Sequence, residues 1–291
     1  GRWEKVLKRL VLLNKHHPLS GNSCSKEKFA RKYDGSKATA TDIYNIVRSS
    51  VISQGLVFFG GYASGLYGKY MSAKERKQIV GIPDFDILST DAESSAVIIK
   101  EQLIHAGYDT VTINKKPGVG ELITAHYEIM ITHNNLTDVI CYIYNTSSCH
   151  SYNNITMDGE TLKIASIDTM LSFYLVFIYI DRPYYDVNRL LCMSEYLFRV
   201  QLKNRLEQKG LLKRFSIDCY GKHHTLEDNR AEKSKSYKSL KEKKCNRGCK
   251  EFDVAFLRYI PGQVIEMKPP VTKKTKQTKK KSKTLSRSKS R

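Results

Sequence analysis

The sequence predicts an α/β fold, in which a mixed sheet is followed by a mainly helical C-terminal part. The apolar run LVFFGG (56–61) and the run IPDFDILS (82–89) are typical of short buried strands, the first ending at paired glycines. Residues 121–145 alternate between apolar and polar around Asn134-Asn135, the pattern of two antiparallel strands joined by a turn. Together these runs predict a sheet of at least four strands.

Helical spacing of apolar residues occurs around these strands. In the segment 94–108 this spacing ends at Gly107, which suits a helix C-cap. The same spacing predicts further helices at 3–13, 41–53 and 166–179, and another from residue 186 onwards.

The order of these elements predicts four parts. They are an N-terminal helical segment (1–50), an α/β domain (51–165), a mostly helical domain (166–266) and a tail (267–291). The tail is rich in Lys, Arg and Ser, which is the composition of a disordered basic segment.

The formal net charge of +20 favours polyanionic partners. Residues 268–291 carry 11 Lys and Arg and no acid, which leaves +9 on the rest of the chain. RNA, DNA and nucleotides therefore fit better than an acidic protein surface or an anionic membrane.

No secretory signal and no apolar run of the ~20 residues that a membrane span needs is present, so we expect a soluble, intracellular protein without a membrane partner. The seven cysteines are an odd number in a chain without an export signal, which predicts free thiols. A zinc site at Cys245 and Cys249 with His223 and His224 would match no common spacing.

Two carboxylates share one face of the strand at 82–89. Because side chains alternate along a strand, Asp84 and Asp86 point to the same side. Like charges this close favour a bound cation, and hard oxygen ligands suit Mg²⁺. The competing interpretation is a solvated strand end beside Pro83.

Three further features support a site for a metal and a phosphate. Gly60-Gly61 would let backbone N–H groups approach a triphosphate, and the Ser64 hydroxyl could hold a phosphate oxygen. Asp138 is an isolated carboxylate in the apolar strand LTDVICYIY and could supply a third metal ligand. Alternatively, Asp138 lies at the wet mouth of the hairpin.

A strand ending in GG, a D-x-D strand and a later strand with a third Asp resemble the nucleotidyltransferase fold of DNA polymerase β and poly(A) polymerases. RWEKVLKRLVLL, GGYASGLYGKY, PDFDILS, SIDTMLSFYLVFIY and CYGKHHTLEDNR look like the poly(A) polymerase catalytic subunit of large cytoplasmic DNA viruses, of the giant-virus type. The resemblance spans roughly residues 2–260. Twenty-three positions separate Gly61 from Asp84, more than is usual in this fold.

The resemblance implies a catalytic domain at 51–165 that adds AMP from ATP to the 3′ end of mRNA without a template. It implies two Mg²⁺ or Mn²⁺ ions held by Asp84, Asp86 and Asp138. The phosphates of the incoming nucleotide would contact Gly60, Gly61 and Ser64. It also implies cytoplasmic viral factories and the virion as locations, and a homodimer or a viral processivity protein as a partner.

The resemblance leaves the RNA contacts and the base-binding residue open. Candidate RNA or phosphate contacts are the basic residues Lys69, Lys74, Arg76, Lys77, Lys115 and Lys116. Candidates for stacking on a base are Tyr62, Tyr67, Tyr127, Tyr142 and Tyr144.

Two other classes of function compete with polyadenylation. A non-catalytic RNA-binding protein could keep a degenerate nucleotidyltransferase fold, and another terminal nucleotidyltransferase would share the same residues. A P-loop ATPase is excluded, because Gly68-Lys69 is followed by Tyr70 in place of Ser or Thr.

Overall fold

The structure is a computed structural model. It describes residues 19–21, 24 and 37–256, except 77–84, 120–121, 134–135, 181, 205, 214–217 and 223–224. These residues belong to one compact unit, Gly1–Leu257. The predicted helix at 3–13, Asp84, Lys77, the histidines of the alternative zinc site and the basic tail lie outside the described residues.

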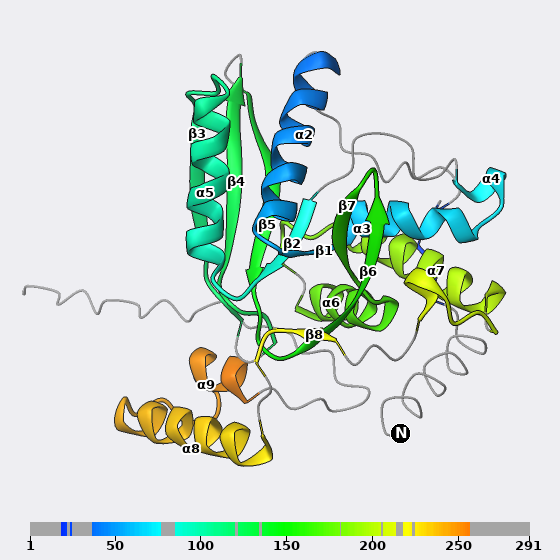
Figure 1. The fold of residues 1–291 in the computed structure, drawn as a ribbon. Helices are drawn as coiled ribbons and strands as arrows, with labels where there is room; N and C mark the ends of the chain where they lie inside the picture. The colour runs from blue at the N-terminus through cyan, green and yellow to red at the C-terminus, as the bar shows by residue number, and fades with distance from the viewer. Residues whose placement is uncertain are drawn as a thin grey trace, which may run out of the picture. The chain divides into compact units, whose positions relative to one another are not determined.

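An eight-stranded mixed sheet forms the centre of this unit (Figure 1). Its strand order is β3 (Val111–Lys116), β4 (His126–His133), β5 (Leu136–Asn145), β2 (Phe85–Ser89), β1 (Val57–Phe59), β7 (Glu160–Ala165), β6 (His150–Met157) and β8 (Cys219–Tyr220). The pairs β2–β5 and β1–β7 are parallel, and the other neighbours are antiparallel. The predicted α/β fold with a mixed sheet is therefore confirmed.

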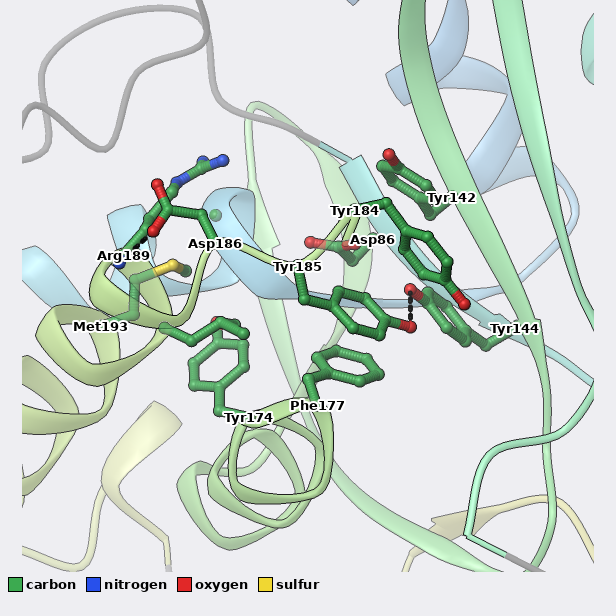
Figure 2. Close-up of a pocket in the computed structure, with 12 residues that line it drawn as sticks. Asp86, Tyr142, Tyr144, Tyr174, Phe177, Tyr184, Tyr185, Asp186, Arg189 and Met193 are labelled. Atoms are coloured by element: carbon green, nitrogen blue, oxygen red, sulfur yellow. Dashed lines mark hydrogen bonds between the residues drawn. The ribbon is translucent and has the colours of Figure 1, made fainter. Parts of the chain in front are cut away.

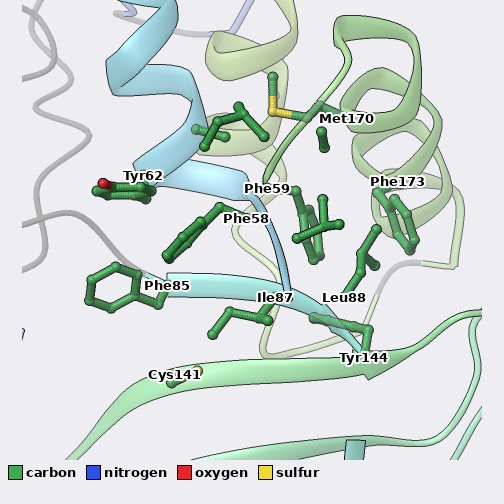
Figure 3. Packing of buried hydrophobic residues seen from close by; sticks show 14 of the residues in the cluster. Phe58, Phe59, Tyr62, Phe85, Ile87, Leu88, Cys141, Tyr144, Met170 and Phe173 are labelled. Atoms are coloured by element: carbon green, nitrogen blue, oxygen red, sulfur yellow. The ribbon is translucent and has the colours of Figure 1, made fainter. Parts of the chain in front are cut away.

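Adjacent phenylalanines on β1 show how the sheet is covered on its two faces (Figure 3). Phe58 contacts Tyr62 and Phe85 on one face. Phe59 points to the opposite face, where it contacts Tyr144 and Phe173. All six rings are buried, so the core has two apolar layers separated by the sheet.

Two pairs of long helices pack around the sheet. α2 (Lys37–Ser53) packs against α5 (Ala92–His105), and α5 contacts β3, β4 and β5. α6 (Ile167–Ile180) lies on the Phe59 face through Phe173 and packs against α7 (Val187–Lys203). The predicted domain boundary at 165–166 falls between β7 and α6.

The remaining helices are short or lie near the C-terminal end. α3 (Gly60–Tyr67) follows β1 directly and is followed by α4 (Ala73–Arg76). Single 3₁₀ turns occur at Gly68–Tyr70 and Gly210–Leu212, and α8 (Leu226–Glu242) pairs with α9 (Lys250–Ala255). No helix among the described residues is both long enough and apolar enough to span a membrane.

The prediction that the cysteines are free thiols is wrong for six of them. Disulfides join Cys24 to Cys192, Cys149 to Cys219 and Cys245 to Cys249, with Cα atoms 5.2–5.5 Å apart. Buried Cys141 is outside these three disulfides, which accounts for the odd number. Two of these pairs join residues 168 and 70 positions apart, so only the tertiary fold brings them together.

Candidate functional site

The turn from β1 into α3 holds a carboxylate close to the backbone. Phe59 pairs with Asp86 across the antiparallel β1–β2 ladder. The next residue, Gly60, has a φ of +66°, and a Cβ at this position would overlap the carboxylate of Asp86. Glycine is therefore required at position 60 for two reasons: its positive φ, and the Asp86 carboxylate that occupies the place of a Cβ.

A pocket of about 240 Å³ opens beside this turn. Figure 2 shows Asp86 between two groups of side chains, with Asp186 and Arg189 on one side and Tyr142 and Tyr184 on the other. Gly61 also lines the pocket, from the first turn of α3. Because the first N–H groups of a helix lack intrahelical acceptors, this edge of the pocket can bind an anion.

Aromatic rings make up most of the remaining wall, and they come from β5, α6 and the loop before α7. They are Tyr142, Tyr144, Tyr174, Phe177, Tyr184 and Tyr185. Tyr185 stacks on Phe177 at 4.4 Å, and its hydroxyl lies 3.3 Å from that of Tyr144. Burial raises the pKa of both tyrosines, with the nearby Asp86 charge adding to the effect. Both phenols are therefore neutral hydrogen-bonding groups at pH 7.

Lys116 brings a positive charge to the aromatic side of the pocket. Its Nζ lies 5.2 Å from the centre of the Tyr184 ring and 3.2 Å from the carboxylate of Glu128. Beside it, His126 stacks on Tyr144, and burial lowers the pKa of the imidazole. Lys115 points to the other side of β3, where it pairs with Glu93.

Asp138 does not join Asp86. In the sheet Asp86 pairs with Tyr142, which pairs with Glu128, so these side chains share the face that bears the pocket. Asp138 pairs with Ile131, which lies three residues after Glu128 on β4. Because side chains alternate along a strand, Ile131 and its partner Asp138 point to the face opposite Glu128. The structure thus corrects the expectation that Asp138 completes a three-carboxylate set.

A β-bulge is the physical reason for this separation. Ile129 pairs with Cys141 and Met130 pairs with Val139, so Ile140 is an extra residue in β5. One extra residue reverses the alternation of all residues before it. Without the bulge, Asp138, four residues before Tyr142, would point to the same face as Tyr142, which is the face of the pocket.

The other predicted phosphate and RNA contacts lie outside the lining of the pocket. Ser64 is buried, with its hydroxyl 3.2 Å from that of Tyr174, so it supports the wall from behind. Lys69 lies over the Tyr70 ring. Lys74 and Arg76 are exposed on α4.

Of the five tyrosines predicted as base-stacking candidates, Tyr142 and Tyr144 line the pocket. Tyr62, Tyr67 and Tyr127 are buried in the core. The sequence analysis missed Tyr184, Tyr185 and Arg189, although the run RPYYDVNR contains a signal for them. Two adjacent tyrosines precede Asp186, whose side chain caps α7 by accepting the N–H of Arg189 at 3.0 Å.

The lining of the pocket has the chemistry of a nucleotide-binding site. It combines a carboxylate, an arginine and a helix start on one side with aromatic rings on the other, which suit phosphates and a base respectively. Among the described residues no group of three His, Cys, Asp or Glu side chains could hold a metal ion. Asp86 is a carboxylate of this lining whose hard oxygen atoms suit a divalent cation.

Comparisons with known proteins indicate the fold. No family model matches the sequence, and neither does any curated protein. The crystal structure of the Megavirus polyadenylate synthase matches with a TM-score of 0.57 and 15% identity over 84% of this chain, which spans 50% of that protein. An antigenic nucleotidyltransferase-like protein from Paracoccidioides brasiliensis matches at a TM-score of only 0.31, with 11% identity over 54% of this chain and 74% of its own. The first likeness shows that this chain shares the fold of that polyadenylate synthase over most of its own length.

Proposed function

We propose that this chain transfers AMP from ATP to the 3′ hydroxyl of RNA without a template. The observation that carries the proposal is the Asp86 carboxylate held against Gly60, beside Gly61 at the start of α3, in a pocket with aromatic walls. A polyadenylate synthase shares the fold, which supports RNA adenylation over other nucleotidyl transfers.

The two sides of the pocket suggest an orientation for ATP. The triphosphate would lie between Gly61 and Arg189, where backbone N–H groups and a guanidinium can bind phosphate oxygens. The adenine would lie among the tyrosines, because every base can stack on an aromatic ring. The neutral hydroxyls of Tyr144 and Tyr185 could hydrogen-bond to the base without adding charge.

In this proposal Asp84 and Asp86 would hold a divalent cation. Such an ion would neutralise the phosphates and lower the pKa of the attacking hydroxyl. Gly60 keeps the Asp86 carboxylate in place, and the rings around the pocket exclude water. Asp138 takes no part, since it lies on the other face of the sheet.

A primer-extension assay with matched variants tests the proposal. Labelled RNA would be incubated with Mg²⁺ or Mn²⁺ and each nucleoside triphosphate separately, using wild type, Asp86→Asn and Asp138→Asn. We expect extension with ATP in wild type and Asp138→Asn, and a loss of at least ~100-fold in Asp86→Asn. Equal loss in both variants would contradict the placement of Asp138, and extension with another nucleotide alone would identify a different terminal nucleotidyltransferase.

A second candidate is a protein that binds RNA or nucleotide without catalysis. It is favoured by Tyr142, which occupies the position beside Asp86 on β5 where a carboxylate would complete a metal centre. This candidate predicts that folded wild-type protein binds ATP and RNA but extends no primer with any nucleotide.

A further inference from the structure

The α8–α9 segment (225–256) presents a helix that is exposed almost all round. Among the α8 side chains that the structure describes, Leu240 is the one that is buried. Of the contacts that α8 makes with other elements, those with α9 dominate, and there Tyr237 packs against Phe252 and Phe256. A helix that is polar on nearly every side gains little stability from packing, so a ligand that covers it would stabilise it.

Charge is distributed unevenly along this helix. Its first turn carries Glu227 and Asp228, and Thr225 and Asp228 form a capping box there. From Lys233 to Arg247 the sequence contains seven Lys and Arg residues and one acid, Glu242. The C-terminal half of α8 is therefore strongly basic and has the sign that the helix dipole favours.

Three lysines form a continuous stripe in the basic half. Lys235, Lys238 and Lys241 follow one another at intervals of three residues, so they are neighbours on the helix surface and span about 9 Å. All three are exposed, and the ion pairs found among the described residues do not include them. The stripe thus carries positive charge that the described part of the chain does not neutralise.

The turn after α8 extends the same surface. The disulfide between Cys245 and Cys249 closes it, and Lys244 at its start has a φ of +56°. Arg247 is exposed within the closed turn. The covalent bond holds this arginine near the end of the lysine stripe, so the two together make an extended basic surface.

We propose that this basic surface, Lys235 to Arg247, binds the phosphate backbone of RNA. Exposed Ser234, Ser236 and Ser239 alternate with the lysines and can donate hydrogen bonds to phosphate oxygens. The half-exposed Tyr237 can stack on a base. A docked acidic protein would need a larger apolar contact area, and Tyr237 is the exposed large hydrophobic residue that the structure describes on α8.

The choice of RNA as ligand rests on the proposed function, but its test is independent of catalysis. A 3′-blocked RNA oligonucleotide would be titrated with the full chain by fluorescence anisotropy, without ATP or divalent metal, at several salt concentrations. We expect the Lys235→Ala/Lys238→Ala/Lys241→Ala variant to lower the slope of log Kobs against log salt by about 2, since each single-stranded phosphate contact contributes ~0.7. Affinity at about 50 mM salt should fall at least ~10-fold.

Two control variants separate a local contact from net charge. Lys100→Ala/Lys209→Ala/Lys213→Ala removes the same charge elsewhere and should leave the slope unchanged. Lys235→Arg/Lys238→Arg/Lys241→Arg keeps the charge and should bind like wild type. Thermal unfolding would verify that every variant is folded.

Each outcome of this titration supports or overturns the proposal. Equal loss in both alanine variants, or no change in either, would overturn it. Polyglutamate would be titrated in parallel as a mimic of an acidic protein. If the Lys235→Ala/Lys238→Ala/Lys241→Ala variant lost binding to polyglutamate but kept its binding to RNA, the partner would be an acidic protein and the proposal would be overturned. If the slope falls as expected but no primer is extended, RNA docking stands and the proposed transferase activity fails.

Discussion

Any side chain at position 60 would meet the Asp86 carboxylate, and Gly159 provides a control for this effect. Both glycines have positive φ, +66° and +79°, but a Cβ at Gly159 would touch nothing within 4 Å. Alanine at either position should therefore cost ~1–2 kcal/mol for its backbone conformation. Only Gly60→Ala should also displace Asp86.

We expect Gly60→Ala to lower AMP incorporation by ~100-fold or more, because displacement of a catalytic group by about 1 Å has that effect. Gly159→Ala should keep its activity. Chemical denaturation and primer extension would measure the two effects separately. Equal activity of both variants would mean that Asp86 need not lie against Gly60.

At the residue scale, the sequence predicted part of the pocket. Asp86, Gly61, Tyr142 and Tyr144 were candidates, and all four line it. Asp138 was expected there as an isolated carboxylate in an apolar strand, but the bulge at Ile140 turns it to the other face, and no residue type near Ile140 marks the bulge. A bulge depends on the partner strand as much as on its own sequence.

The start of α7 allows a prediction at the scale of one element. Asp186 caps α7, as Asp91 caps α5, and each accepts a backbone N–H three residues later. Removing either cap should lower Tm by roughly 2–4 °C. Asp186 also lines the pocket next to Tyr185 and Arg189, whereas Asp91 is not part of its lining.

Asp186→Ala should therefore raise the KM for ATP several-fold, while Asp91→Ala should change only Tm. Asp186→Asn keeps a capping oxygen without the charge, and it should preserve Tm. If Asp186→Asn raised KM as much as Asp186→Ala, the carboxylate charge rather than the cap would be responsible. Steady-state kinetics and thermal unfolding would provide both readouts.

Elements with strong patterns were predicted from the sequence, and weakly patterned strands were missed. The strands β1, β2, β4 and β5 and the long helices α2, α5, α6 and α7 coincide with predicted segments. β3 and β6 were missed because their sequences, VTINKK and HSYNNITM, are too polar for a buried-strand pattern. They are stabilised by antiparallel pairing with β4 and β7, the strands that follow them in the chain.

At the scale of the whole molecule, the disulfides close loops of very different length. The bond between Cys24 and Cys192 joins residues 168 positions apart and fastens the segment before α2 to α7. The bond between Cys245 and Cys249 joins residues four positions apart. The number of cysteines in the sequence predicts neither pairing. Cys24 and Cys192 in particular come close together only in the folded chain.

A disulfide that closes a long loop restricts the unfolded chain more strongly than one that closes a short loop. Under oxidising conditions Cys24→Ser should therefore lower the free energy of unfolding by about 3 kcal/mol more than Cys245→Ser does. Cys192→Ser should match Cys24→Ser, and combining the two should add little, because each breaks the same bond. Chemical denaturation measures these values, and dithiothreitol should abolish the difference between wild type and each variant. If thiol titration of the unfolded, unreduced protein found seven free thiols, these disulfides would be absent in solution, and the long-loop variants would lose their expected effect.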